Sequence, residues 1–332
     1  MDELTRVREL YGEPKPDPVL KARVGALLEA EARRRLRRPW TAAVAGLAAA
    51  VVAAVVIALP GGSPGIPVPT PEPSGRSILL AAAVTAESGP VQAGAYWRVR
   101  KLVRQRYPEM LGGGENRYWV IDPRISEQWV SRNGKVWAGA VSLGAEPAGP
   151  GDREAWLQDG SPAEWPGHQV FTAAGPSTLA TVRGGVAFSM AGRPMTFAQI
   201  RSLPADPVAL RAHVAEIVSA DEGVVADALS GLLWSKPSPS DVRAAAYRAL
   251  ADLPNVTYLG TQADESGRAG AAFSFTLREP SGLVRRTLII DTGNSQVISS
   301  TTDAVGVKND QVELVLEAGW TNERPSAPQA PG

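Results

Sequence analysis

The feature that most constrains this chain is an uncharged run of twenty residues, 40–59, with the sequence WTAAVAGLAAAVVAAVVIAL. As a helix it would be about 30 Å long, the thickness of the hydrocarbon core of a bilayer. Nine of its residues are Ala, and the five Val, two Leu and one Ile add insertion free energy of about −2.4 to −4.8 kcal/mol. The run therefore predicts a single transmembrane helix at residues 40–59.

The charges beside this run predict its orientation. An arginine cluster stands immediately before it, and after it the first charged residue is Glu72. The cluster comprises Arg33, Arg34, Arg35, Arg37 and Arg38. Positive residues stay on the cytoplasmic side, so we expect a cytoplasmic N-terminus, with Trp40 as an interfacial anchor. A buried core helix and a cleaved signal peptide are the alternatives, but the arginines disfavour the first and the 39 preceding residues disfavour the second.

Small residues recur at every fourth position of the predicted span, at Ala42, Gly46, Ala50, Ala54 and Ala58. Such a face allows two helices to pack closely, which would make a homodimer through the span. A segment this rich in Ala also produces the pattern by composition alone.

The whole chain is formally neutral, but its two sides are not. Residues 1–38 carry ten Lys and Arg against seven Asp and Glu, a net of +3, which leaves −3 for the remainder. We expect residues 1–39 to form a basic cytoplasmic stub, either a partner-binding helix or only a topology determinant. Residues 60–77, with six Pro and four Gly, predict an extended linker that reaches up to about 50 Å. Residues 322–332 are again Pro-rich and predict a disordered tail.

Residues 78–321 predict one extracytoplasmic α+β domain. A helix at 78–86 precedes strands at 95–104, 117–121, 127–131 and 136–141, with a hairpin turn at Asn133-Gly134 and a long loop at 144–167. Short strands at 168–172 and 186–190 lead to three helices, which begin near Asp206, Asp221 and Ser240. The remaining strands are predicted at 257–262, 271–278, 283–291, 296–302 and 311–317, and the last should turn Val312, Leu314 and Leu316 inward.

The residue inventory excludes several kinds of chemistry. The chain has no Cys, so it has no disulfide, thiol nucleophile or lipid-acceptor cysteine, and its two His alone cannot supply a three-His metal site. No phosphate-binding, nucleophile-elbow or zinc-protease motif occurs. His168 and His213 lack an obvious catalytic partner at motif spacing, so we expect no catalytic residue, no metal and no cofactor.

Tryptophan is the unusual component of the composition, with nine residues against six Tyr and five Phe. In one interpretation these side chains fill the core of a curved sheet. In the other, some line an apolar pocket for a lipid or another hydrophobic ligand. The pocket candidates are Trp97, Trp119, Trp129, Trp137, Trp156 and Trp165. Basic residues are scattered over a net acidic domain, so nucleic-acid binding is not expected.

Several segments together resemble a group of actinobacterial single-pass membrane proteins. They are MDELTRVREL, GAYWRVR, EQWVSRNGKVW, DREAWLQDGSPAEWPG, LPADPVALRAHV, VRAAAYRALADLPNVTYLG and LIIDTGNSQVISS, which are spread over nearly the whole chain. The resemblance implies an outer domain similar to the LolA, LppX and RseB fold, a half-barrel of antiparallel strands with helices on its concave face. It also implies genes near those of extracytoplasmic-function sigma factors, and hence an anti-sigma-like or sensory role.

The zinc-type anti-sigma factors carry a His/Cys motif before the membrane, and this chain has neither residue there. The sequence therefore predicts a non-enzymatic, membrane-anchored binding or sensory domain for a hydrophobic ligand or an envelope protein. An anti-sigma-like regulator acting through the stub and a lipid or lipoprotein handling factor are the alternatives, and a sigma factor is a candidate partner.

Overall fold

A computed structural model describes residues 73–90, 93–279, 282–304 and 311–330. The chain divides into two compact units, residues 1–61 and 62–332, and all described residues belong to the second. The predicted membrane span and its arginine cluster lie outside the described residues. Within the described ranges, no helix has the length and apolarity needed to cross a bilayer.

The first helix, α3 (Gly75–Ser88), starts earlier than the sequence predicts. The side chain of Ser74 caps it by accepting a hydrogen bond from the Ser77 amide at 3.2 Å, so residues 75–77 belong to the helix and not to the predicted linker. Its buried face consists of Leu79 and the small side chains of Ala82, Ala83 and Ala86, which allow α3 to lie closely beside α8 (Ser240–Ala251).

The remaining strands and helices assemble around one large antiparallel sheet. Its strand order is β10-β11-β12-β13-β14-β1-β2-β3-β7, and β4 pairs with β2 outside this path. The strands are β1 (Tyr96–Arg106), β2 (Val120–Ser131), β3 (Val136–Ser142), β4 (Glu146–Pro147), β7 (Thr178–Thr181), β10 (Thr257–Ala263), β11 (Ala269–Glu279), β12 (Gly282–Asp291), β13 (Gln296–Ala304) and β14 (Gln311–Thr321).

The sequence predicts two separate strands where the structure has the single long strand β2. Pro123 lies within it, at the point where β2 changes its partner from β3 to β4. The Pro123 carbonyl accepts a hydrogen bond from the Leu143 amide at 2.8 Å, and proline, which has no amide hydrogen, donates none in return. The hairpin from β2 to β3 is confirmed, with positive φ at Gly134.

The predicted loop 144–167 contains regular structure. Besides β4 it holds helix α4 (Pro150–Gln158) and strand β5 (Glu164–Trp165), which pairs with β6 (Val170–Phe171). A small separate core joins this region to the start of β2, with Tyr118 and Trp165 fully or almost fully buried. The short strands predicted at 168–172 and 186–190 correspond to β6 and β8 (Phe188–Met190), and β8 forms a hairpin with β9 (Arg193–Met195). The sequence predicts neither β9 nor the five-residue helix α5 (Phe197–Arg201).

The three predicted helices are confirmed as α6 (Pro207–Ile217), α7 (Glu222–Trp234) and α8. Asp206 and Asp221 cap the first two, with Asp221 accepting from the amides of Gly223 and Val224. A Cβ on Gly223 would lie 2.2 Å from the Thr276 carbonyl oxygen, so glycine here allows α7 to lie directly on β11. One large core joins these helices and α3 to one face of the sheet.

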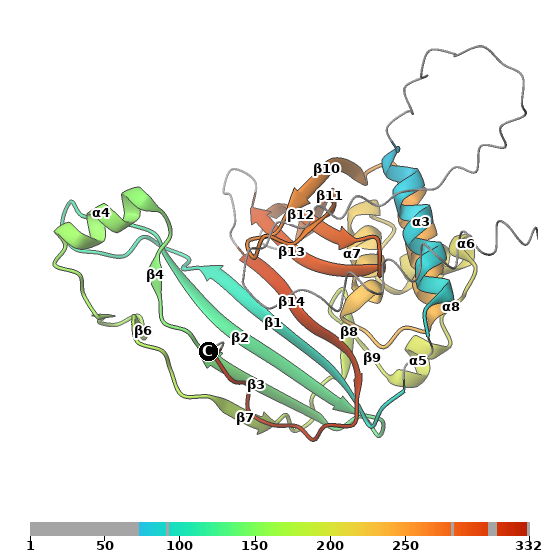
Figure 1. Cartoon of the computed structure of the whole chain (residues 1–332), viewed down its shortest axis with the longest axis horizontal. Helices are drawn as coiled ribbons and strands as arrows, with labels where there is room; N and C mark the ends of the chain where they lie inside the picture. Colours follow the sequence, from blue (N-terminus) through green and yellow to red (C-terminus); the bar gives the residue numbers. More distant parts are fainter. Residues whose placement is uncertain (1–72, 91–92, 280–281, 305–310, 331–332) are drawn as a thin grey trace, which may run out of the picture. The chain divides into compact units, whose positions relative to one another are not determined.

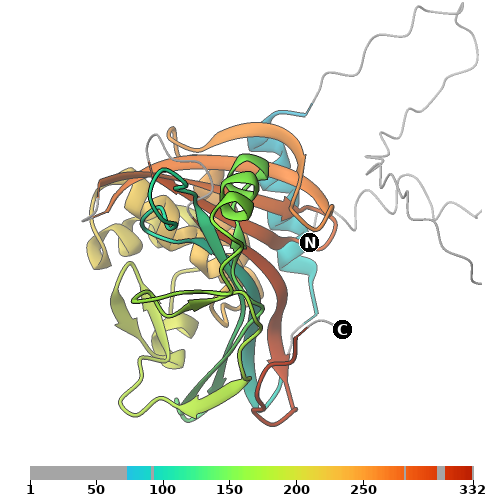
Figure 2. The same ribbon diagram turned by 90° about the vertical axis from the view of Figure 1, so that its left-hand side faces the viewer.

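The arrangement confirms an α+β fold with a large curved antiparallel sheet (Figure 1). Figure 2 shows the bend of the sheet, with α5 to α8 and the β8–β9 hairpin on its inner side. We call this helix-covered face the inner face and the opposite one the outer face. Helix α4 differs from the expected arrangement because it packs beside β4 at the far end of the long strands.

In the last strand, β14, a bulge makes the predicted burial of Leu316 wrong. Val312 and Leu314 are buried as expected, but Leu316 is 39% exposed. The register between β1 and β14 shifts between Arg100 and Lys101, which pair with Glu317 and Val315. Leu316 is thus the extra residue of a bulge, and the alternation of side chains changes at this point.

The C-terminal segment also differs from the expected disordered tail. Residues 322–330 follow a defined path over the outer face of β1, β2 and β3 (Figures 1 and 2). Pro328 is buried there, and the Arg100 guanidinium donates to the Gln329 carbonyl at 2.8 Å. The proline-rich composition that suggests disorder also suits an extended segment held by side chains of a sheet.

One arginine holds the bend of the sheet. Strands β13 and β14 pair only between Ser299–Thr302 and Gln311–Leu314, and beyond this the ladder ends. Arg268, at the start of the β10–β11 hairpin's second strand, donates from its two terminal nitrogens to the carbonyls of Ile298 and Val315, both at 2.8 Å. Its Nε donates to the fully buried carboxylate of Asp264 at 2.7 Å. The guanidinium therefore bridges the two strands where their own hydrogen bonds stop.

We expect Arg268→Ala to lower the free energy of unfolding by about 2–4 kcal/mol, because it leaves two carbonyls and a buried carboxylate without their donor. Urea denaturation of the full chain measures the change. Arg278→Ala, at an exposed position of β11, is the matched control and should change the stability by less than about 0.5 kcal/mol. Equal effects of the two substitutions would contradict the bridging role.

Candidate functional site

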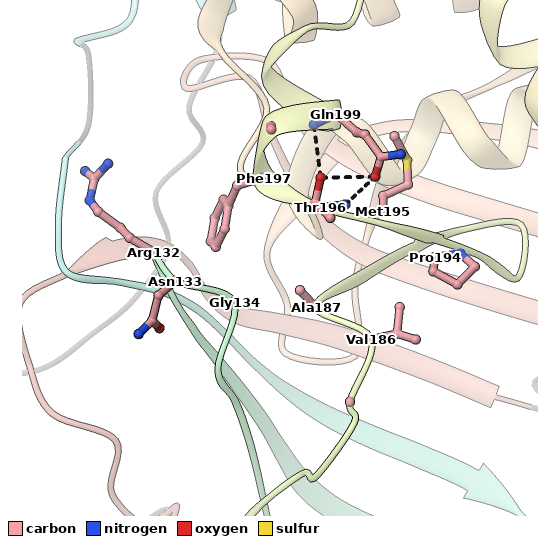
Figure 3. A pocket seen from close by; sticks show the side chains of 12 residues that line it. Arg132, Asn133, Gly134, Val186, Ala187, Pro194, Met195, Thr196, Phe197 and Gln199 are labelled. Carbon is pink, nitrogen blue, oxygen red and sulfur yellow. Dashed lines mark hydrogen bonds between the residues drawn. The ribbon is translucent and has the colours of Figure 1, made fainter.

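A large cavity opens on the inner face, at the end of the β2–β3 hairpin. It has a volume of about 700 Å³ and is lined by residues 132–134, 185–187 and 194–199. We call it the α5 pocket, because the first turn of α5 forms one wall and the segment before β8 forms the other (Figure 3). Volumes of 300–1,000 Å³ are typical of sites for small molecules.

The α5 wall is fixed by a capping box. The Thr196 hydroxyl accepts from the Gln199 amide at 3.2 Å, and the Gln199 side chain accepts from the Thr196 amide at 2.8 Å (Figure 3). This reciprocal pair satisfies the first amides of a helix too short to be stable by itself. Phe197 follows directly, so its ring has a defined position in the pocket wall.

Aromatic rings connect the pocket to the core behind it. The Phe197 ring stacks on Trp320 with centroids 5.4 Å apart and meets the edge of Phe188 at 4.8 Å. Trp320 in turn contacts Trp97 edge-on at 5.8 Å. Such ring pairs add to the stability that burial provides. The wall of the pocket is therefore a continuation of the main core.

Arg132 is the only charged residue among those that line the α5 pocket. Its guanidinium lies 4.6 Å from the ring centroid of Trp320, and its Nε donates to the Gly94 carbonyl at 2.8 Å. The other side chains are mainly apolar, among them Val186, Pro194 and Met195. A cavity of this kind suits an apolar body with an anionic or strongly polar end.

A second, smaller cavity of about 380 Å³ lies beside α4. Behind it the Trp165 indole donates to the Tyr118 hydroxyl, which donates to the Asp159 carboxylate, both at 2.9 Å. Burial, with the Asp159 carboxylate as a further cause, raises the pKa of Tyr118 to about 12. His168 also lines this cavity, with Nδ1 3.2 Å from the Tyr107 hydroxyl and 3.5 Å from the Glu109 carboxylate.

The six tryptophan candidates do not share one pocket. Trp165 lines the smaller cavity, Trp156 packs against the same small core, and Trp119 stacks on the Arg106 guanidinium at 4.6 Å. Trp97 is buried in the main core. Trp129 and Trp137 pair across β2 and β3, and Trp129 lies opposite Arg98 of β1, so both face the outer side of the sheet.

The α5 pocket was therefore missed by reasoning from tryptophan alone. Its aromatic residue is Phe197, which stands in the helix that the sequence does not predict. The Thr196–Gln199 spacing is a capping-box signal that does mark this position. His213 lies exposed on α6 and lines neither cavity. Within the described ranges, no three His, Asp or Glu side chains gather closely enough to hold a metal ion.

A polar cluster lies under the end of α7. Asp227 of this helix forms an ion pair with Arg286 of β12, and Lys236 follows the helix with only 7% of its surface exposed. A Cβ on Gly231 would lie 2.4 Å from the Lys236 ammonium, so glycine allows the ammonium to reach the last turn of α7. Burial lowers the pKa of Lys236 to about 8, against the opposing effect of Asp227.

The pKa of Lys236 predicts how stability depends on pH. Between pH 8 and 10 the folded chain loses this proton while the unfolded lysine, with a pKa near 10.5, keeps it. The unfolded state then binds more protons, so the free energy of unfolding should rise with pH. Lys236→Met should remove the rise in urea denaturation between pH 7 and 10. The exposed Lys135→Met should retain it, and a rise that persists in Lys236→Met would contradict the assignment.

Comparison with protein families, curated proteins and solved structures identified no match to this chain. The likeness to the actinobacterial single-pass membrane proteins thus stays a prediction from the sequence.

Proposed function

We propose that this protein binds a hydrophobic ligand with an anionic end in the α5 pocket. The observation that carries the proposal is an open cavity of about 700 Å³ with mainly apolar walls and a single charged lining residue, Arg132. Apolar walls favour an acyl chain or a similar body, because its burial removes apolar surface from water. Arg132 stands at the rim with its side chain directed away from Phe197 (Figure 3), so the anionic end of the ligand would extend over the rim to reach a charge-assisted hydrogen bond with the guanidinium.

The proposal also includes the anchoring of this domain to a membrane. Its basis is the uncharged run at residues 40–59 behind an arginine cluster, which predicts a span with the binding domain outside the cytoplasm. A linker of up to about 50 Å would then allow the domain to meet lipids or envelope proteins near the surface. Binding without catalysis is the function we assign, in sensing or in lipid handling, and the stub at residues 1–39 is the candidate contact for a cytoplasmic partner such as a sigma factor.

Ligand binding can be tested with cis-parinaric acid, a fluorescent fatty acid, and the purified full chain. We expect its fluorescence to rise on binding, and Ala198→Trp to weaken the affinity at least tenfold because the new side chain fills the mouth of the pocket. Ala198 is exposed and lines the pocket. Ala212→Trp, an exposed position of α6 away from the pocket, is the matched control and should bind as the unaltered chain does.

Arg132→Met tests the contribution of the ligand's anionic end separately from that of its apolar body. It should weaken binding of the fatty acid about tenfold, since a charge-assisted hydrogen bond is worth about 1.5–3 kcal/mol at most in such settings. Binding of the uncharged fatty alcohol of equal length, measured by its displacement of the fluorescent probe, should change little. No binding of either compound, or equal binding by Ala198→Trp, would refute the α5 pocket as a ligand site.

A further inference from the structure

The outer face of β1, β2 and β3 carries the chain's own C-terminal segment. Residues 322–330, which we call the tail, run over this face on the side opposite to α5 and the β8–β9 hairpin (Figure 2). We call the residues that hold the tail, Arg98, Arg100, Gly139 and Ser177, the tail-binding surface. This surface is separate from the α5 pocket, and the inference does not depend on what that pocket binds.

Side chains of the sheet hold the tail at both of its ends. Near its start, the Glu323 carboxylate accepts from the Arg98 guanidinium at 3.2 Å. Near its end, the Arg100 guanidinium donates to the Gln329 carbonyl at 2.8 Å, and the Ser177 hydroxyl donates to the Pro328 carbonyl. All three contacts are side chain to side chain or side chain to carbonyl, and the tail adds no strand to the sheet.

The surface is shaped for a proline. Pro328 is buried over Gly139, and a Cβ at position 139 would lie 2.7 Å from the Pro328 Cδ atom. Trp137 is two residues away on the same strand and so lies on the same face, where its ring meets Tyr96 edge-on at 5.8 Å. Aromatic side chains beside a flat position are the usual means of binding extended proline-containing segments.

Two buried polar groups of this face lack partners among the described residues. The Glu127 carboxylate is almost fully buried and pairs with Arg98, but its second oxygen has no hydrogen-bond partner among the described residues. The same holds for the indole nitrogen of Trp129, whose ring lies 4.6 Å from the Arg98 guanidinium. Buried groups of this kind favour an occupant that supplies a donor and an acceptor.

We propose that the tail-binding surface is a docking site for extended, proline-containing protein segments that carry a glutamate, and that the tail is its resident occupant. The chemistry of the tail defines the partner, with a glutamate for Arg98 and a proline about five residues later for Gly139. A tethered segment has an effective concentration in the millimolar range, which keeps the surface covered until a partner segment competes. The partner is a protein segment of this chemistry, bound in place of the tail.

The experiment uses the full chain with its tail released by Glu323→Lys and Pro328→Asp. These changes reverse the charge that meets Arg98 and place a carboxylate at the buried proline position. A fluorescein-labelled peptide with the sequence of residues 321–332 is the probe, and its fluorescence anisotropy measures binding. We expect micromolar affinity for the released chain and at least tenfold weaker binding to the unaltered chain, whose own tail competes.

Matched controls identify the surface. Arg324→Glu changes a charge in the tail at an exposed side chain, and this chain should exclude the peptide as the unaltered chain does. Adding Arg100→Ala and Ser177→Ala to the released chain should weaken peptide binding several-fold. A peptide that carries the two tail substitutions should not bind.

Three results would overturn the proposal. One is a released chain that keeps its circular dichroism and melting temperature but binds no peptide at 1 mM. Another is equal binding to the released and unaltered chains, which would place the peptide elsewhere. The third applies if the released chain does not fold: Glu323→Lys alone, at a carboxylate that is 71% exposed, then replaces it and should admit the peptide with intermediate affinity. Exclusion of the peptide by this variant as complete as by the unaltered chain would overturn the proposal.

Discussion

The sheet depends on the guanidinium of Arg268 at the place where β13 and β14 stop pairing. Four residues of each strand form the ladder, and beyond it the carbonyls of Ile298 and Val315 accept from this one side chain. Asp264 is fully buried and accepts both from the Arg268 side chain and from backbone amides of the same turn, so the β10–β11 turn fixes the orientation of the guanidinium. A planar group with five donors suits this task, because it can meet two carbonyls and a carboxylate at once. The bend that it stabilises separates the helix-covered meander from the long strands β14, β1, β2 and β3.

Because of this bend, the two faces of the long strands are covered by different parts of the chain. On the inner face, Trp97 joins the core formed with the helices, and its neighbour Trp320 stacks on Phe197, which lines the α5 pocket. On the outer face, Trp129 is completely buried although it is not part of that core. The tail and the side chains of β1 lie on this face instead, which explains why a segment with the composition of a disordered tail has a fixed path. An exposed sheet face rich in aromatic residues would otherwise be an open hydrophobic patch.

The sequence predicts the elements of this fold well where local chemistry decides them. Asp206 and Asp221 mark the starts of α6 and α7, and the meander turns define the strands from β10 to β13. Pairing between strands that are distant in sequence has no comparable signal in the local sequence. The bulge that exposes Leu316 and the register that places Trp97 and Trp129 on opposite faces depend on which residues of β1 meet β2 and β14. For the same reason a set of tryptophans could suggest a pocket, while the residues that form it come from a turn, a hairpin and a five-residue helix far apart in sequence.

The α5 pocket and the tail-binding surface are connected by a few consecutive residues at the end of β14. Trp320 stacks with Phe197 in the pocket wall, and it stands three residues before Glu323, which meets Arg98 on the outer face. The β2–β3 hairpin makes the same connection through the sheet, since its turn lines the pocket and Gly139 of β3 receives Pro328. Contiguity alone does not transmit a signal, because coupling needs an element with two arrangements that each site favours differently. Under the proposed exchange the tail is such an element, docked or displaced, and its first residues follow Trp320, whose ring stacks on Phe197 in the pocket wall. A shift of Trp320 would therefore act first on the Glu323 end of the tail, and the Pro328 end would follow.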